Sequence, residues 1–244
     1  FSWQHLVFVT CAILITVLLS VFFARKYKDK NRNEKLRPLK VASIIMLSAE
    51  TLKIILVCFR NHDVWAFRSV LPLFLCSILL ISLPIAAFGK GRVQESALDF
   101  TQIFGYIACL AGTYLAGNIF ASPILSFHVN VSVFTHCISC FAALYITLTG
   151  LSKMEKKNIW IVSAILLVFE IAALIVDIIQ TPSPYEGNYM FLIHPAGTPF
   201  SILMNAAGNI QALYTFFVMA IYFIYMFLFI GGYYLITKFK PKAN

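Results

Sequence analysis

Charged residues are scarce in this sequence: they make up 12% of its 244 residues, and only ten are acidic. A soluble domain usually has about 25% charged residues, most of them on its surface. Hydrophobic residues instead make up 60% of this chain, and so little charge cannot cover that much apolar surface in water. The composition argues against a soluble enzyme, a disordered chain and a nucleic-acid-binding protein. It predicts an integral membrane protein whose surroundings are lipids.

Long polar stretches are also rare, and seven apolar runs are each long enough to cross a bilayer core of about 30 Å as a helix. No alternation of apolar and polar residues persists within them, which argues against a transmembrane β-barrel. The expected fold is all-α, a single polytopic domain over residues 1–244 with seven transmembrane helices. Pro72 falls in the first turn of the third run, where its missing N–H costs little, and Pro84 predicts a kink near the end of that run. The runs are 3–24, 41–59, 70–88, 100–121, 127–149, 159–181 and 211–236.

Basic residues are almost absent from one set of the connecting segments. The other set, residues 25–40, 89–99, 150–158 and the C-terminal tail, carries sixteen Lys and Arg, whereas the first set has only Arg60 and Arg68. Short loops rich in Lys and Arg stay in the cytoplasm. We therefore expect a multi-pass protein of the cell membrane with its N-terminus outside and its C-terminus in the cytoplasm.

One connection is unusually long. Residues 182–210 contain four prolines and three glycines, yet they also include Tyr189, Met190, Phe191 and Leu192. A connection of this length without regular structure is often functional. Its apolar content predicts an external flap that folds back on the mouth of the bundle, and an ordinary surface loop is the alternative.

Polar residues at membrane depth are costly and often functional. At 1.5 Å per helical residue, Cys76 lies about 9 Å from the external end of its run, and Glu50 and His136 lie about 13–14 Å from theirs. We expect a polar cavity in the outer half of the bilayer. Glu50 could instead form an intrahelical pair with Lys53. Other candidate cavity-lining or substrate-binding residues are His5, His128, Asp177, Asn188, Tyr189 and His194.

Two groupings of these residues have chemical potential. Cys76 and His136 offer a thiol nucleophile and an imidazole base, the minimum for acyl transfer. His136, Cys137 and Cys140 could present three soft ligands on one helix, but a structural zinc site needs a fourth ligand. We therefore expect neither a metal nor a cofactor. The six cysteines all lie in or beside apolar runs, so we interpret them as reduced, buried thiols.

Several strings across the whole chain resemble the YwaF-like family of bacterial integral membrane proteins. They are Phe-Ser-Trp-Gln-His-Leu from Phe1, Leu-Pro-Leu-Phe-Leu-Cys ending at Cys76, the histidine at His136, and Gly-Asn-Tyr-Met-Phe-Leu from Gly187. That family is similar to a eukaryotic transmembrane acyltransferase that remodels ether phospholipids with a membrane-embedded cysteine and a histidine. The resemblance implies that Cys76 and His136 are catalytic and that a phospholipid is the substrate.

The sequence departs from the family pattern at two positions. Phe74 stands where the family commonly has a histidine, and Cys137 stands where a glycine often follows the fifth-run histidine. The first departure removes a polar group near the proposed nucleophile, so membership alone does not establish activity. The expected function is an acyltransferase or lipid hydrolase that acts on phospholipid acyl chains. The alternative is a non-enzymatic transporter or sensor that holds a small ligand in the same cavity. The sequence does not determine the head group or acyl chain of a lipid substrate, or the oligomeric state of the protein.

Overall fold

The computed structural model describes residues 3–115, 126–180 and 187–238, except for the side chain of His128. These residues form helices and turns, with no strand among them. Three short elements of other helical types interrupt the α-helices: a 3-10 helix at Val64–Val70, a π-helix at Ala111–Leu115 and a 3-10 helix at Tyr189–Phe191. The α-helices are α1 (Trp3–Lys26), α2 (Arg32–Lys35), α3 (Arg37–Asn61), α4 (Leu79–Phe88), α5 (Gly91–Leu110), α6 (Phe127–Thr149), α7 (Lys156–Gln180), α8 (Ser201–Ala206) and α9 (Gln211–Lys238).

Five helical stretches in the described residues are long and apolar enough to cross a membrane. They are α1, the stretch Arg32–Asn61 that joins α2 and α3, most of α6, α7 and α9. The protein is therefore an all-helical, multi-pass membrane protein, and five of the seven predicted runs have a spanning helix.

The third predicted run does not form one continuous helix. Its first half is the end of the 3-10 helix followed by turns at residues 71–78, and only Leu79–Phe88 is α-helical. Pro72 therefore lies in a turn and not in a first helical turn, so that prediction is wrong. Pro84 does lie inside α4. Proline cannot donate a backbone hydrogen bond, which favours the irregular start of this run.

The fourth predicted run begins earlier than expected. Helix α5 starts at Gly91 and buries a polar series that includes Gln94, Asp99 and Gln102. These residues lower its mean hydropathy, yet each has a packed partner; the Gln102 amide, for example, donates to Thr147 Oγ1 of α6 at 3.0 Å. Residues 116–121 of the predicted run lie outside the described part of the chain.

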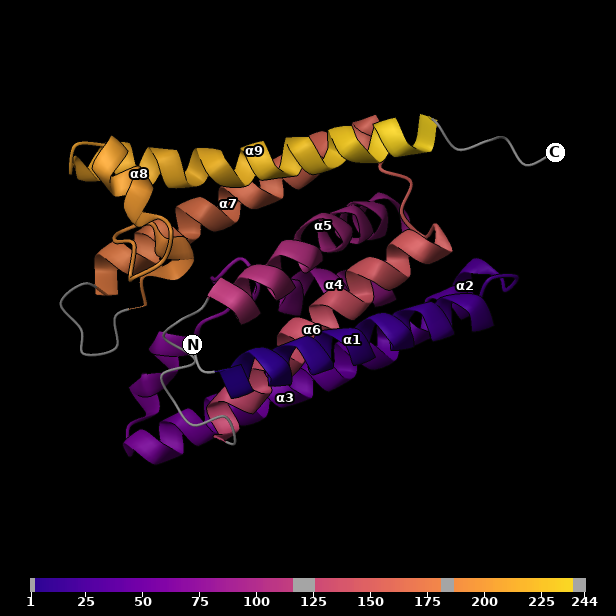
Figure 1. The fold of residues 1–244 in the computed structure, drawn as a ribbon, viewed down its shortest axis with the longest axis horizontal. Coiled ribbons are helices and arrows are strands. Elements are labelled where there is room, and N and C mark those ends of the chain that lie inside the picture. The colour runs from indigo at the N-terminus through magenta and orange to yellow at the C-terminus, as the bar shows by residue number, and fades with distance from the viewer. Residues whose placement is uncertain (1–2, 116–125, 181–186, 239–244) are drawn as a thin grey trace.

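Helices α5 and α6 form the centre of the bundle (Figure 1). Helices α1 and α3 pack against α6, α4 packs between α3 and α5, and α7 contacts α5. Helices α5 and α6 approach closely at Gly105 of α5, where an added Cβ would lie 2.6 Å from the Ser139 carbonyl oxygen and 2.8 Å from the Ala143 Cβ. Small residues allow membrane helices to approach this closely.

A methyl group at Gly105 is therefore expected to destabilise the bundle. The clash involves backbone as well as a side chain, so we expect Gly105→Ala to cost about 1–3 kcal/mol, as overpacking typically does. Thermal unfolding in detergent measures this effect. Gly231→Ala in α9 is the matched control, because nothing lies within 4 Å of an added Cβ there. Equal unfolding temperatures for the two variants would show that the contact is looser than described.

Helix α9 is tied to the rest of the bundle by hydroxyl groups. Tyr225 donates to the Ile103 carbonyl of α5 at 2.7 Å, and Tyr234 donates to the Met154 carbonyl between α6 and α7. On the side facing α7, Ser163 Oγ lies 3.9 Å from the Met226 sulfur. Figure 1 shows α7 and α9 running along the same edge of the molecule. These bonds fix the helix that carries part of the candidate site.

Candidate functional site

Tyr189 connects the long segment after α7 to two other parts of the bundle. Its backbone N–H donates to Asp177 Oδ1 at 2.8 Å, near the end of α7. Its phenol donates to the Arg68 carbonyl and accepts a bond from the Leu71 N–H at 3.1 Å. Burial raises the pKa of Tyr189 to about 12, so the phenol keeps its proton at neutral pH. The segment thus lies against the bundle, as a flap that folds back would.

Three hydroxyl groups of α9 donate hydrogen bonds to three consecutive backbone carbonyls of this segment. Tyr222 donates to Met190 at 3.0 Å, Tyr214 to Phe191 at 2.7 Å and Thr215 to Leu192 at 2.8 Å. These bonds hold a strained backbone, because Asn188, Met190 and Phe191 all have left-handed φ angles of 47–59°. Such residues cost of order 1–3 kcal/mol each and persist where the surroundings fix them, often at functional sites.

Asn188 and His194 stabilise the turn that follows. The Asn188 side-chain oxygen accepts from the Ile193 N–H at 3.2 Å and from the His194 N–H at 3.1 Å. Its amide nitrogen donates to the His194 carbonyl at 2.8 Å and lies 3.2 Å from His194 Nδ1. Both predicted site residues therefore have a local structural role, and their contact with a substrate head group stays a prediction.

The bond from Tyr189 to Asp177 gives a test of how firmly the segment is held. Losing a hydrogen bond to a charged group costs about 1.5–3 kcal/mol, so we expect Asp177→Ala to speed hydrogen exchange of the Tyr189 amide by at least about tenfold. Asp177→Asn keeps an acceptor oxygen and is expected to retain most of the protection. Ile178→Ala is the matched control, because Ile178 is the next residue of α7 and its side chain is exposed. Unchanged exchange in Asp177→Ala would contradict this role.

Cys76 lies in the non-helical turns that precede α4, and it is half-buried. Its sulfur is 3.9 Å from the hydroxyl oxygen of Ser77. Two residues earlier, the Phe74 ring packs edge-on against Tyr189 at 5.0 Å and lies 6.0 Å from Phe191. The turn that carries Cys76 is therefore in direct contact with the flap. Phe74 contributes aromatic packing to the flap. The bacterial family that the sequence resembles commonly has a histidine at the position of Phe74.

His136 is buried on α6, with 6% of its surface exposed. Its ring packs on the π-helix, because a Cβ added to Gly112 would lie 2.3–2.7 Å from ring atoms of His136. Glu50 and Lys53 form a buried ion pair one turn apart on α3, as the intrahelical alternative predicted. Helix α3, which carries the ion pair, contacts both α6, which carries His136, and α4, which follows the turn of Cys76. The approach of the Cys76 thiol to the His136 ring stays a prediction.

Glu170 of α7 is a further buried acidic group. It is fully buried, and in the described part of the chain neither of its carboxyl oxygens has a hydrogen-bond partner. The Tyr222 phenol of α9 is also buried, and it donates to the Met190 carbonyl. Buried polar side chains thus occur on α3, α6, α7 and α9, and their grouping into one site stays a prediction.

Two further predicted residues lie in the first turns of α1 and α6. His5 is buried on α1, and the side chain of His128 is outside the described residues. Within the ranges the structure describes, no three His, Cys, Asp or Glu side chains form a group that could hold a metal. All six cysteines are free, and Cys109, Cys137 and Cys140 are buried as expected. The prediction of buried thiols is wrong for Cys11, which is exposed on α1, and for Cys58 and Cys76, which are half-buried.

The sequence interpretation missed the α9 hydroxyls that hold the flap. Tyr222 is seven residues from Thr215 and eight from Tyr214, so all three lie near one helical face. All three are buried in an otherwise apolar helix. A buried face with repeated hydroxyls was the available signal, and it was masked by the abundance of tyrosine in the chain.

The fold defines an all-helical, multi-pass membrane protein. Residues 1–232 match the TMEM164 family, and the chain belongs to that family. This match does not support the bacterial YwaF-like label. Comparisons with curated proteins and with solved structures gave no match.

Proposed function

We propose that this protein is a membrane-embedded acyltransferase or lipid hydrolase that acts on phospholipid acyl chains. The observation that carries the proposal is the position of Cys76, half-buried in the non-helical turn whose Phe74 ring packs against Tyr189, while His136 is buried on α6. The proposal pairs this thiol with that imidazole, since covalent acyl transfer needs a nucleophile and a base. Membership in a membrane family and the resemblance to a cysteine-dependent acyltransferase support the same assignment.

In this mechanism the reaction has two balanced steps. His136 takes the thiol proton as the Cys76 sulfur attacks the acyl carbonyl carbon of a phospholipid ester. A thioester forms, the ester C–O bond breaks, and His136 returns the proton to the departing lysophospholipid oxygen. The hydroxyl of a second lysophospholipid then attacks the thioester while His136 takes its proton, and the Cys76 thiol is regenerated. Water in place of that hydroxyl gives hydrolysis.

We further propose that the N-terminus and the flap are outside the cell membrane and the C-terminus is in the cytoplasm. The support is the distribution of Lys and Arg, sixteen against two among the connecting segments, which determines orientation in multi-pass proteins. The substrate ester would then come from the outer leaflet. The two broken runs, at residues 70–88 and 100–121, complete the seven passes of this proposal.

Transfer between two lipids tests the function directly. The purified protein in detergent micelles is mixed with a phospholipid that has a labelled acyl chain and with an unlabelled lysophospholipid of a different head group. We expect labelled diacyl lipid with the second head group, or labelled free fatty acid if water is the acceptor. Label that remains entirely on the donor phospholipid, with none in the second diacyl lipid or in free fatty acid, would reject the proposal.

A second candidate is a transporter or sensor that binds a small ligand in the same region. The buried and unpartnered Glu170 favours it, because such carboxyls in membranes often mark relays or binding sites. This alternative predicts proton-coupled uptake that is lost in Glu50→Gln and no acyl transfer. Uptake that is unaffected by this substitution would leave the alternative without support.

A further inference from the structure

A separate basic surface lies where α2 meets α3. An open cleft of about 820 Å³ is lined by Asn31, Arg32, Asn33, Glu34, Arg37 and Lys40. A second cleft of about 350 Å³ shares Arg32 and is lined mainly by charged residues from the start of α5 and from the loop and first turn at the start of α7. Along α3, Arg37 is 13 residues from Glu50, or about 20 Å at 1.5 Å per residue. The surface is therefore distinct from the region around Cys76.

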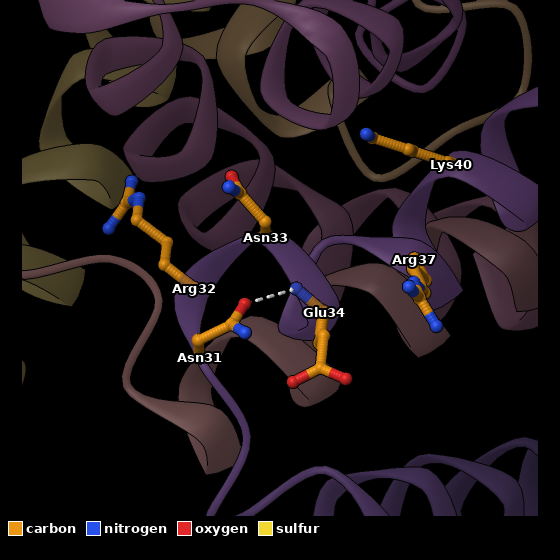
Figure 2. Close-up of a pocket in the computed structure, with 6 residues that line it drawn as sticks. All are labelled: Asn31, Arg32, Asn33, Glu34, Arg37 and Lys40. Atoms are coloured by element: carbon orange, nitrogen blue, oxygen red, sulfur yellow. Dashed lines mark hydrogen bonds between the residues drawn. The ribbon is translucent and has the colours of Figure 1, made fainter.

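Most of the acidic groups on this surface are already neutralised. Arg32 pairs with Glu95, and Lys157 pairs with Glu155 at 2.6 Å. Figure 2 shows the Glu34 carboxylate directed away from Arg32 and Lys40. The basic residues left over, which form no ion pair within the described part of the chain, are Arg37, Lys40, Arg92 and Lys153.

The cleft continues into an apolar surface. Val41 and Ile44 follow Lys40 on α3, within one helical turn of it. Their side chains are 57% and 56% exposed. The Lys40 ammonium lies 5.6 Å from the centre of the Phe88 ring, which is itself exposed. Cations beside exposed apolar side chains match a molecule with an anionic head and a hydrocarbon tail.

We propose that this cleft binds an anionic phospholipid, with its phosphate at Arg37 and Lys40 and one acyl chain along Val41 and Ile44. Clusters of Lys and Arg beside a membrane helix attract anionic lipids with about 1 kcal/mol per charge. The free cations supply the attraction, and the apolar continuation of α3 distinguishes a lipid from a soluble phosphate. This site is independent of the proposed acyl transfer.

The test measures binding of a fluorescent phosphatidylglycerol to the purified full-length chain in neutral detergent, with fluorescent phosphatidylcholine as the comparison. We expect preferential binding of the anionic lipid. The double variant Arg37→Gln/Lys40→Gln is expected to weaken it by about 10-fold to 30-fold. Lys28→Gln/Lys30→Gln is the matched control, because it removes the same charge from exposed positions outside the cleft. The control is expected to bind like the unmodified protein.

Three outcomes would overturn the proposal. Equal binding of the two lipids would show that charge does not select the ligand. An equal loss in both double variants would show a diffuse effect of net charge and no site. Displacement of the lipid by millimolar inorganic phosphate, with no loss in Val41→Ser/Ile44→Ser, would assign the cleft to a soluble anion instead. Unfolding temperatures of all variants confirm that each remains folded.

Discussion

Cys76→Ala is expected to reduce acyl transfer by at least about 10³-fold, since removal of a covalent nucleophile leaves only binding and orientation. The substitution exchanges a half-buried thiol for a methyl group in a turn, so the change in stability is expected to be small beside the change in rate. Initial rates of label transfer between phospholipid and lysophospholipid measure the effect. Cys76→Ser is expected to be nearly as inactive, because a hydroxyl is a much weaker nucleophile than a thiolate.

The control for this prediction is Cys11→Ala. Cys11 is exposed on α1, so its removal tests whether any cysteine substitution affects the preparation. We expect the rate of Cys11→Ala to equal that of the unmodified protein. A normal rate in Cys76→Ala would contradict the covalent mechanism, and a fall in both variants would point to a general effect on the bundle.

His136→Gln is expected to lower the transfer rate by about 10²–10⁴-fold, the usual contribution of a positioned general base. Glutamine has similar size and keeps a polar group on α6, but it cannot take the thiol proton. A companion variant tests position without changing the base. In Gly112→Ala the new methyl group would overlap the imidazole ring, so the ring must shift, and we expect an intermediate loss of rate.

Two further measurements separate catalysis from structure in the His136 series. Phe134→Ala on the same helix is the matched control, because it alters an exposed side chain and is expected to leave the rate unchanged. The double variant Cys76→Ala/His136→Gln is expected to be no slower than Cys76→Ala alone, since groups that act in one step are not additive. A double variant whose loss of transfer rate equals the product of the two single losses would contradict a shared step.

Much of the fold could be predicted from the sequence because apolar length is a local property. The runs at 3–24, 159–181 and 211–236 each became one helix of sufficient length. The prediction of one helix over residues 70–88 was wrong, because the length of an apolar run does not determine whether its first half is helical. There the Tyr189 phenol binds the Arg68 carbonyl and the Leu71 N–H, so backbone groups are satisfied by a distant side chain and not by a helix.

The site was less predictable, because depth in the membrane does not determine which way a side chain faces. Residue spacing predicts Cys76, Glu50 and His136 at similar depth, but only the packing of α3 against α4 and α6 relates the elements that carry them. The string around Tyr189 carries the family resemblance, and the α9 hydroxyls hold its left-handed backbone. Those hydroxyls could not be assigned from one sequence, since their partners are 23 or 32 residues away in the chain.

The most direct test of the account is to find the acyl group on the protein. The purified chain is incubated with a phospholipid of defined acyl composition and no acceptor, acid-quenched, digested, and mapped by mass spectrometry. The covalent mechanism predicts one acyl adduct, on the peptide that contains Cys76, which hydroxylamine releases and which accumulates when lysophospholipid is absent. An adduct on another cysteine, or transfer activity without any adduct at Cys76, would contradict it.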